Sequence, residues 1–193
     1  YLLSNIITKF YDKFYAFYIL ELKNYLIRKN IDFFSLIYTL TEPEIGNPII
    51  VKDGNKSLSQ DLLNSIHEFY SILRDYKNLN DYKNILTENK IHILEIGAGY
   101  GRLAYVFLSA LRNSTYTIVD ILPALFLSQE YLKNLFPNRK IMEFREFNNF
   151  KEIKNEFDTS EIRFILPHQL KLIPEKSIDI SININSFQEM TKE

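Results

Sequence analysis

The stretch ILEIGAGYGR, residues 93–102, decides the fold: an apolar run leads into three glycines at alternate positions. Glycine is favoured where the backbone turns sharply and where a ligand approaches the main chain without meeting a Cβ. A helix that begins directly after such a turn points its first amides outward and favours an anionic group. The stretch therefore predicts a strand, a glycine turn that contacts a ligand, and a helix.

The segments that follow continue the alternation of strand and helix. The expected strands are 91–96, 115–119, 163–166 and 178–184. The expected helices are 100–112, 123–136 with Pro123 in its first turn, and 150–157 inside an insertion at 140–160. Because strands that alternate with helices build parallel sheets, we predict the α/β class with a Rossmann-like parallel sheet over residues 89–193.

Residues 1–88 are interpreted as a helical N-terminal extension, or lid, that ends at the polar connector 77–90. Residues 1–28 predict one amphipathic helix that packs against other helices. Its apolar stripe consists of Leu3, Ile7, Phe10, Phe14, Tyr18, Leu22 and Tyr25. Asp53–Gly54 predicts a hairpin turn, and Ser57 with Gln60 has the spacing of a capping box at the start of a helix.

Composition argues against several classes of function. The 193 residues carry a formal net charge of −1, so no nucleic-acid partner is expected. The absence of cysteine removes disulfides, thiolate zinc sites and thiol catalysis, and fits a cytoplasmic location. Lys9, Asp12 and Lys13 interrupt the aromatic N-terminal segment, so neither a secretory signal nor a membrane span is expected.

The spacing of the glycines separates two classes of cofactor. The dinucleotide fingerprint G-x-G-x-x-G, counted from Gly97, requires a third glycine where Arg102 stands. Asp120, at the end of the next strand, can accept hydrogen bonds from both hydroxyls of a ribose. The alternative is that Asp120 caps the helix that starts near Pro123.

The pattern E-x-G-x-G-x-G from Glu95 to Gly101 resembles motif I of class I S-adenosylmethionine-dependent methyltransferases. The resemblance implies that Gly97 and Gly99 lie under the methionyl part of S-adenosylmethionine, with Glu95 near its ammonium or sulfonium group. It also implies that the segment FILPHQL, residues 164–170, passes beside the adenine. The cofactor-binding residues expected on this basis are Glu95, Gly97, Ala98, Gly99, Gly101, Asp120, Ile121, Pro167, His168 and Gln169.

A narrower resemblance, to bacterial sugar O-methyltransferases, covers most of the chain from about residue 47 onward. It is carried by GNPIIV, SQDLLNSIHEFYSI, EIGAGYGRLAYVFL, YTIVDILPALFLSQEYL, LPHQL and NSFQEM. The resemblance implies methylation of a sugar hydroxyl in the biosynthesis of a surface glycan. The expected partner is therefore a glycan or another small-molecule acceptor.

Methyl transfer from a sulfonium is an in-line displacement, so the protein mainly aligns the acceptor and removes its proton. In this fold the acceptor is expected beyond the carboxyl end of the strand 178–184. Glu189 lies in that region and is a candidate base or metal ligand, or alternatively a solvated acid. His168 is the second catalytic candidate. No histidines or carboxylates stand at a metal-binding spacing, so no metal site is assigned. The expected acceptor-binding residues are Asn185, Ser186 and Gln188.

Two polar residues are interpreted as structural. His92 begins the first strand, at the sheet edge opposite the cofactor, and Asp179 precedes the fourth strand.

Four strands can be counted, whereas a class I methyltransferase sheet has seven. The sheet is therefore expected to be truncated after the fourth strand, its open edge covered in a homo-oligomer or by a missing C-terminal portion. Two alternatives to the sugar methyltransferase remain: a catalytically incomplete fragment that binds S-adenosylmethionine, and a methyltransferase for another small molecule.

Overall fold

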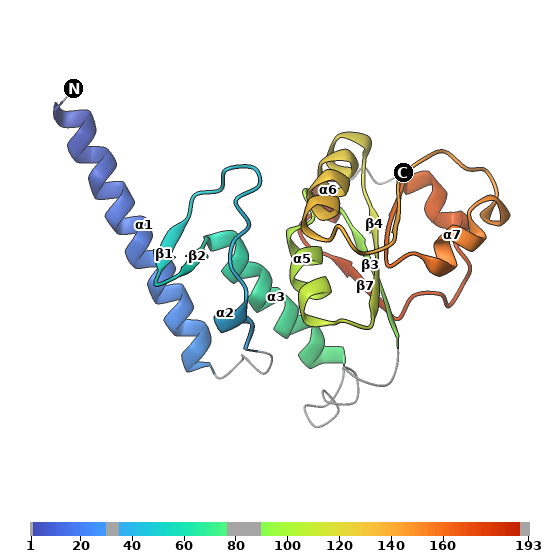
Figure 1. The fold of residues 1–193 in the computed structure, drawn as a ribbon, viewed down its shortest axis with the longest axis horizontal. Helices are drawn as coiled ribbons and strands as arrows, with labels where there is room; N and C mark the ends of the chain where they lie inside the picture. The colour runs from blue at the N-terminus through green and yellow to red at the C-terminus, as the bar shows by residue number, and fades with distance from the viewer. Residues whose placement is uncertain (1, 30–34, 77–89, 190–193) are drawn as a thin grey trace. The chain divides into compact units, whose positions relative to one another are not determined.

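The computed structural model describes residues 2–29, 35–76 and 90–189 (Figure 1). The chain forms two compact units, residues 1–73 and 74–193. The expected domain boundary between residues 88 and 89, and the connector up to residue 89, lie outside the described residues.

The first unit combines helices with one hairpin. Its elements are α1 (Leu2–Arg28), α2 (Leu36–Thr39), β1 (Val51–Asp53), β2 (Lys56–Leu58) and α3 (Gln60–Tyr76). The antiparallel pair β1–β2 turns at Gly54, as the Asp53–Gly54 pair predicted. Among the described helices of the chain, none combines the length and apolar character needed to span a bilayer.

The long helix α1 forms as predicted, but a different face of it is buried. Phe14 and Tyr25 on the expected stripe are 62% and 43% exposed, whereas Ile19 and Leu26 are buried. The hydroxyl of Tyr15, on the buried face, donates to the carbonyl of Ile49. The buried aliphatic residues Ile19 and Leu26 each stand one position after an aromatic residue of the predicted stripe, Tyr18 and Tyr25. Periodicity alone cannot decide which of two such adjacent stripes is buried. The predicted stripe was therefore wrong for the described side chains.

The helix α3 begins at Gln60, two residues later than the capping box predicted, and its cap is Ser59. The Ser59 hydroxyl accepts a hydrogen bond from the Leu62 amide at 2.9 Å. Ser57 belongs to β2 instead, where its amide donates to the Thr41 hydroxyl. The predicted cap was wrong because the strand continues to Leu58 and leaves only Ser59 free to cap.

The second unit is an α/β layer structure around a five-stranded parallel sheet, which confirms the predicted class. Its strands are β3 (Ile91–Ile96), β4 (Ser114–Val119), β5 (Ile141–Met142), β6 (Ile162–Ile165) and β7 (Ile180–Asn183), in the order β5-β6-β4-β3-β7. The strands β4, β5 and β6 lie on one side of β3, with β6 between β4 and β5, and the chain then crosses back to place β7 on the other side. The order thus reverses between β3 and β7, the place where doubly wound sheets bind ligands at their carboxyl ends.

Helices cover both faces of this sheet (Figure 1). One face carries α5 (Arg102–Ala110) and α6 (Leu122–Leu135), and the Phe107 ring of α5 lies 5.8 Å from the Tyr116 ring of β4. The other carries α7 (Lys154–Thr159), whose Phe157 joins Leu94 and Val119 in one apolar cluster. Short 3-10 turns complete the unit: η2 (Phe150–Glu152), η3 (Pro167–Leu172) and η4 (Phe187–Glu189).

Candidate functional site

The glycine turn follows β3 directly and adopts conformations that side chains resist. Gly97 has φ +76° and Gly99 has φ +59°, both in the left-handed region that L-residues avoid. The Gly97 amide donates to the carbonyl of Val119 at 2.9 Å, which extends the β3–β4 pairing by one bond. The turn is therefore a rigid continuation of the sheet.

The three glycines have different surroundings. A Cβ on Gly97 would lie 2.2 Å from the Ser186 Oγ, so Ser186 packs directly on the backbone there. A Cβ on Gly101 would lie 3.3 Å from Leu132 of α6, so Gly101 lets α5 and α6 approach closely. A Cβ on Gly99 would meet nothing within 4 Å. Of the three, Gly99 is the one that offers bare backbone to a ligand.

Asp120 binds the glycine turn as well as its own neighbour. Its Oδ2 accepts a hydrogen bond from the Gly99 amide at 3.0 Å, and its Oδ1 accepts one from the Ile121 amide at 2.8 Å. Ile121 precedes α6 as its N-cap residue, and no side chain caps that helix. The Asp120 carboxylate therefore ties the turn after β3 to the end of β4, and the alternative interpretation as a cap of α6 is not what the structure contains.

The end of β7 is fastened to the end of β3 by two polar side chains. The Asn183 amide and the Ser186 hydroxyl both donate to the Ile96 carbonyl, at 2.9 and 3.0 Å. Asn183 also bonds to Ser186 and accepts from the Phe187 amide. The sequence analysis missed Asn183, although an asparagine that ends an apolar strand was a signal that could have found it.

Glu95 lies one residue before the end of β3 and is buried. Its Oε2 accepts a hydrogen bond from the Tyr116 hydroxyl of β4 at 2.8 Å. The carboxylate thus lies on the side of the sheet that carries α5, since the Tyr116 ring packs against Phe107. Its predicted position near the ammonium group of a cofactor stays a prediction.

The turn η3 follows β6 at the same edge of the sheet and holds three of the predicted residues. Pro167 and His168 are exposed, and the His168 Nε2 lies 3.0 Å from the Glu146 carboxylate. Gln169, in contrast, is fully buried. Its side chain accepts from the Leu166 amide and donates to the Arg145 carbonyl, both at 2.9 Å. The Gln169 amide is thus bonded within the turn and presents no surface, and its predicted contact with the adenine stays a prediction.

The remaining predicted residues lie at the same edge. Ile121 is 64% exposed beside Asp120, and Ala98 is half-buried within the turn. Asn185 has φ +63° and Gln188 is exposed, both beyond β7. Glu189 ends η4, and its side chain lies outside what the structure describes.

The carboxyl edge of the sheet offers open backbone and a carboxylate to a ligand. Open backbone at Gly99, the Asp120 carboxylate and the exposed Ile121 side chain follow the ends of two adjacent parallel strands. In the part of the chain that the structure describes, no three histidine, aspartate or glutamate side chains lie close enough to hold a metal ion.

Comparison with known proteins adds no family to this geometry. No family model matches the sequence, and no curated protein matches it either.

Proposed function

We propose that the second unit binds S-adenosylmethionine at the carboxyl edge of its sheet and that the chain is a methyltransferase. One observation carries the proposal: the Asp120 carboxylate is bonded to the amide of Gly99, and the space over Gly99 is open. The two ribose hydroxyls of a nucleoside bind to a carboxylate, and the methionyl part of the cofactor can approach a main chain that carries no side chains. The open main chain and the carboxylate follow the adjacent strands β3 and β4, and β3 borders the point where the strand order reverses.

The packing of the third glycine supports S-adenosylmethionine over a dinucleotide. In the dinucleotide fingerprint the last glycine allows close packing of the helix, and it stands three positions after the second. Here that close-packing role belongs to Gly101, two positions after Gly99, and Arg102 begins α5. The pyrophosphate geometry therefore has no matching third glycine in this turn.

The residues fit the proposed cofactor as follows. Asp120 keeps lone pairs for two ribose hydroxyls, since each carboxylate oxygen accepts one hydrogen bond from the backbone and can accept a second. The exposed Ile121 offers an apolar surface for the base. When bound, S-adenosylmethionine supplies an activated methyl group, so the protein need only align the acceptor and take its proton.

The acceptor proton needs a base close to the same edge. In the proposed reaction the hydroxyl oxygen of the acceptor bonds to the methyl carbon as the carbon–sulfur bond breaks, and the hydroxyl proton passes to a base. Of the two candidate bases, His168 is the one whose side chain the structure describes. The Glu146 carboxylate lies 3.0 Å from its Nε2 and orients the ring, so Nδ1 can take the proton. Glu189 is the second candidate. A sugar hydroxyl is the proposed acceptor, on the resemblance to bacterial sugar O-methyltransferases alone.

Calorimetric titration tests the cofactor assignment. S-adenosylhomocysteine should bind the wild type, and Asp120→Ala should weaken that binding at least about a hundredfold, because two charge-assisted hydrogen bonds are lost at about 1.5–3 kcal/mol each. Glu152→Gln, which changes an exposed acid on η2, is the matched control and should bind as the wild type does. Binding of NADH without binding of S-adenosylhomocysteine would overturn the assignment.

Methyl transfer is tested separately from binding. Radiolabelled S-adenosylmethionine is incubated with nucleotide-sugars, with His168→Gln compared to wild type at equal cofactor saturation. Transfer to a sugar that falls in His168→Gln supports the proposal in full. Binding without transfer to any sugar would leave a cofactor-binding protein, and transfer to a different small molecule would correct the acceptor.

A further inference from the structure

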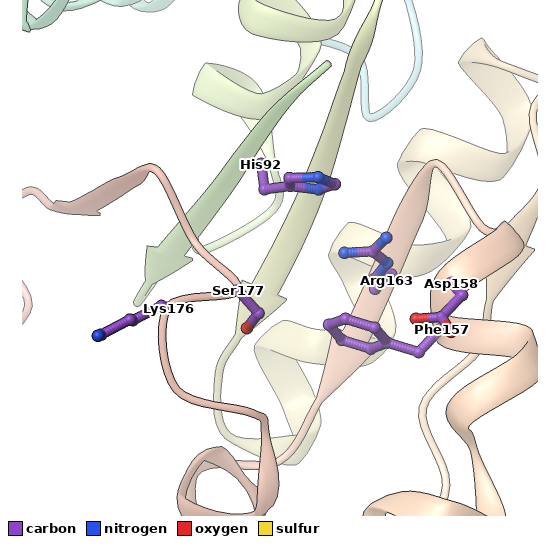
Figure 2. A pocket seen from close by; sticks show the side chains of 6 residues that line it. All are labelled: His92, Phe157, Asp158, Arg163, Lys176 and Ser177. Atoms are coloured by element: carbon purple, nitrogen blue, oxygen red, sulfur yellow. The ribbon is translucent and has the colours of Figure 1, made fainter. Parts of the chain in front are cut away.

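A cavity of about 250 Å³ lies at the opposite edge of the same sheet (Figure 2). It is lined by His92, Phe157, Asp158, Arg163, Lys176 and Ser177. His92 and Arg163 are each the second residue of their strands, β3 and β6. The cavity therefore lies at the amino ends of the strands, away from Gly99 and Asp120 at the carboxyl ends.

Two buried polar side chains at this edge of the sheet have atoms that the protein does not satisfy. Arg163 is only 2% exposed, and its Nε and Nη1 have no hydrogen-bond partner. Thr117, its partner in the β4–β6 register, is fully buried, and its Oγ1 also has none. Buried polar groups are nearly always hydrogen-bonded in folded proteins, so an exception of this kind calls for a ligand or ordered water.

The guanidinium keeps its charge in this position. Burial lowers the pKa of Arg163 to about 10, so the side chain is still cationic at neutral pH. The Phe157 ring lies 3.9 Å from the guanidinium carbon and compensates part of the charge. A ring face does not occupy the N–H donors, however, so Nε and Nη1 still lack a hydrogen-bond partner.

The surrounding charges favour an anion over a cation. Asp158, the acid of the lining, is ion-paired with Lys154 on α7 and also acts on Arg163, whose pKa it raises. Burial and the nearby Arg163 lower the pKa of His92, so its imidazole is neutral at neutral pH. In Figure 2 the amino group of Lys176 points away from Arg163, which leaves the guanidinium as the cation that faces the cavity.

The size of the cavity limits the ligand. Its volume exceeds that of a single water, whose share of liquid is about 30 Å³. It falls below the range of about 300–1,000 Å³ typical of sites for drug-sized ligands. A guanidinium binds carboxylate and phosphate groups through charge-assisted hydrogen bonds.

We propose that this cavity is a binding site for a small oxyanion, a phosphate or carboxylate group held by the free donors of Arg163. The site is separate from the cofactor edge and does not depend on the proposed methyltransferase activity.

Calorimetric titration of the full chain with sodium phosphate and with sodium acetate tests the site, with sodium chloride at equal ionic strength as the blank. At least one of the two oxyanions should bind the wild type saturably. Binding of phosphate or of acetate then shows whether the site takes a phosphate or a carboxylate group. Arg163→Met should weaken this binding at least about tenfold, as expected for loss of a charge-assisted contact. Arg112→Met removes the same charge from an exposed position and should bind as the wild type does.

The wild type alone can refute the proposal. If neither phosphate nor acetate binds saturably, Arg163 is solvated by water only, whatever the variants do. Equal loss of binding in Arg112→Met and Arg163→Met would also overturn it, because it would show a general effect of charge. Should Arg163→Met fail to fold, Arg163→Lys keeps the charge without the planar fork and should still weaken binding.

Discussion

The contact between Gly97 and Ser186 joins two segments 89 positions apart, and a double-mutant cycle measures its strength. In Gly97→Ala the new methyl would lie 2.2 Å from the Ser186 Oγ and 2.3 Å from its Cβ. The Cβ is fixed by the backbone, so the segment after β7 must move. The residue also keeps φ +76°, which costs an L-residue about 1–2 kcal/mol.

The magnitude of the effect follows from these two parts. Overpacking costs about 1–3 kcal/mol, so Gly97→Ala should lower the free energy of unfolding by about 2–5 kcal/mol. In the background of Ser186→Gly the steric part disappears and the same change should cost only about 1–2 kcal/mol. The expected coupling energy is therefore about 1–3 kcal/mol.

Urea unfolding followed by circular dichroism gives the four free energies of the cycle. Gly99→Ala is the matched control, because it has a similar φ of +59° and open space around the new methyl. It should show the conformational cost alone. The reasoning is refuted if Gly97→Ala costs no more than Gly99→Ala, or if Gly97→Ala and Ser186→Gly add within about 0.5 kcal/mol.

Three further changes test the site and its frame. Gly99→Ala should weaken S-adenosylhomocysteine binding at least about tenfold by calorimetry, because a methyl fills the space that the ligand needs; unchanged affinity would contradict the open-backbone argument. Gln169→Leu should destabilise the fold by about 2–4 kcal/mol, since it leaves the Leu166 amide and the Arg145 carbonyl unpaired, yet the folded protein should keep its affinity for S-adenosylhomocysteine. Burial lowers the pKa of His92 below its ordinary 6.5, so below that pH the unfolded chain binds more protons than the folded chain, and the free energy of unfolding should fall as the pH falls from 6.5 to the folded-state pKa. His92→Gln should make this fall less steep when it is measured by urea unfolding at several pH values. An unchanged slope would exclude His92 as its source.

The strands and helices of the second unit were predictable because their signals are local. The glycine turn marks the end of β3, and Pro123 marks the first turn of α6. Asp179 was also predicted to be structural, and its carboxylate accepts a hydrogen bond from the His92 amide at 2.8 Å. The edge strand β5 was missed because two residues, Ile141–Met142, are too short to show a period.

The site was less predictable because its contacts depend on register. Ser186 was expected to bind the acceptor, and it packs on Gly97 because β3 and β7 pair Ile96 with Asn183. Gln169 was expected to contact the adenine. In the structure its side chain is buried and accepts a hydrogen bond from the Leu166 amide in the turn after β6. Nothing in a single sequence distinguishes an amide that binds a ligand from one that closes a turn.

The two edges of the sheet differ in how their polar groups are satisfied, and this difference supports two separate ligands. At the carboxyl edge, Asp120 holds the Gly99 amide, and Asn183 holds the Ile96 carbonyl. The turn is thus ordered when the chain folds. A ligand that bonds to the remaining lone pairs of Asp120 therefore does not have to order the turn on binding, which lowers the entropy lost in binding. At the amino edge the protein leaves the Arg163 donors unpaired. Pairing is the rule for buried polar groups, so in our two proposals the first edge takes a ligand that joins completed hydrogen bonds, and the second takes one that completes them.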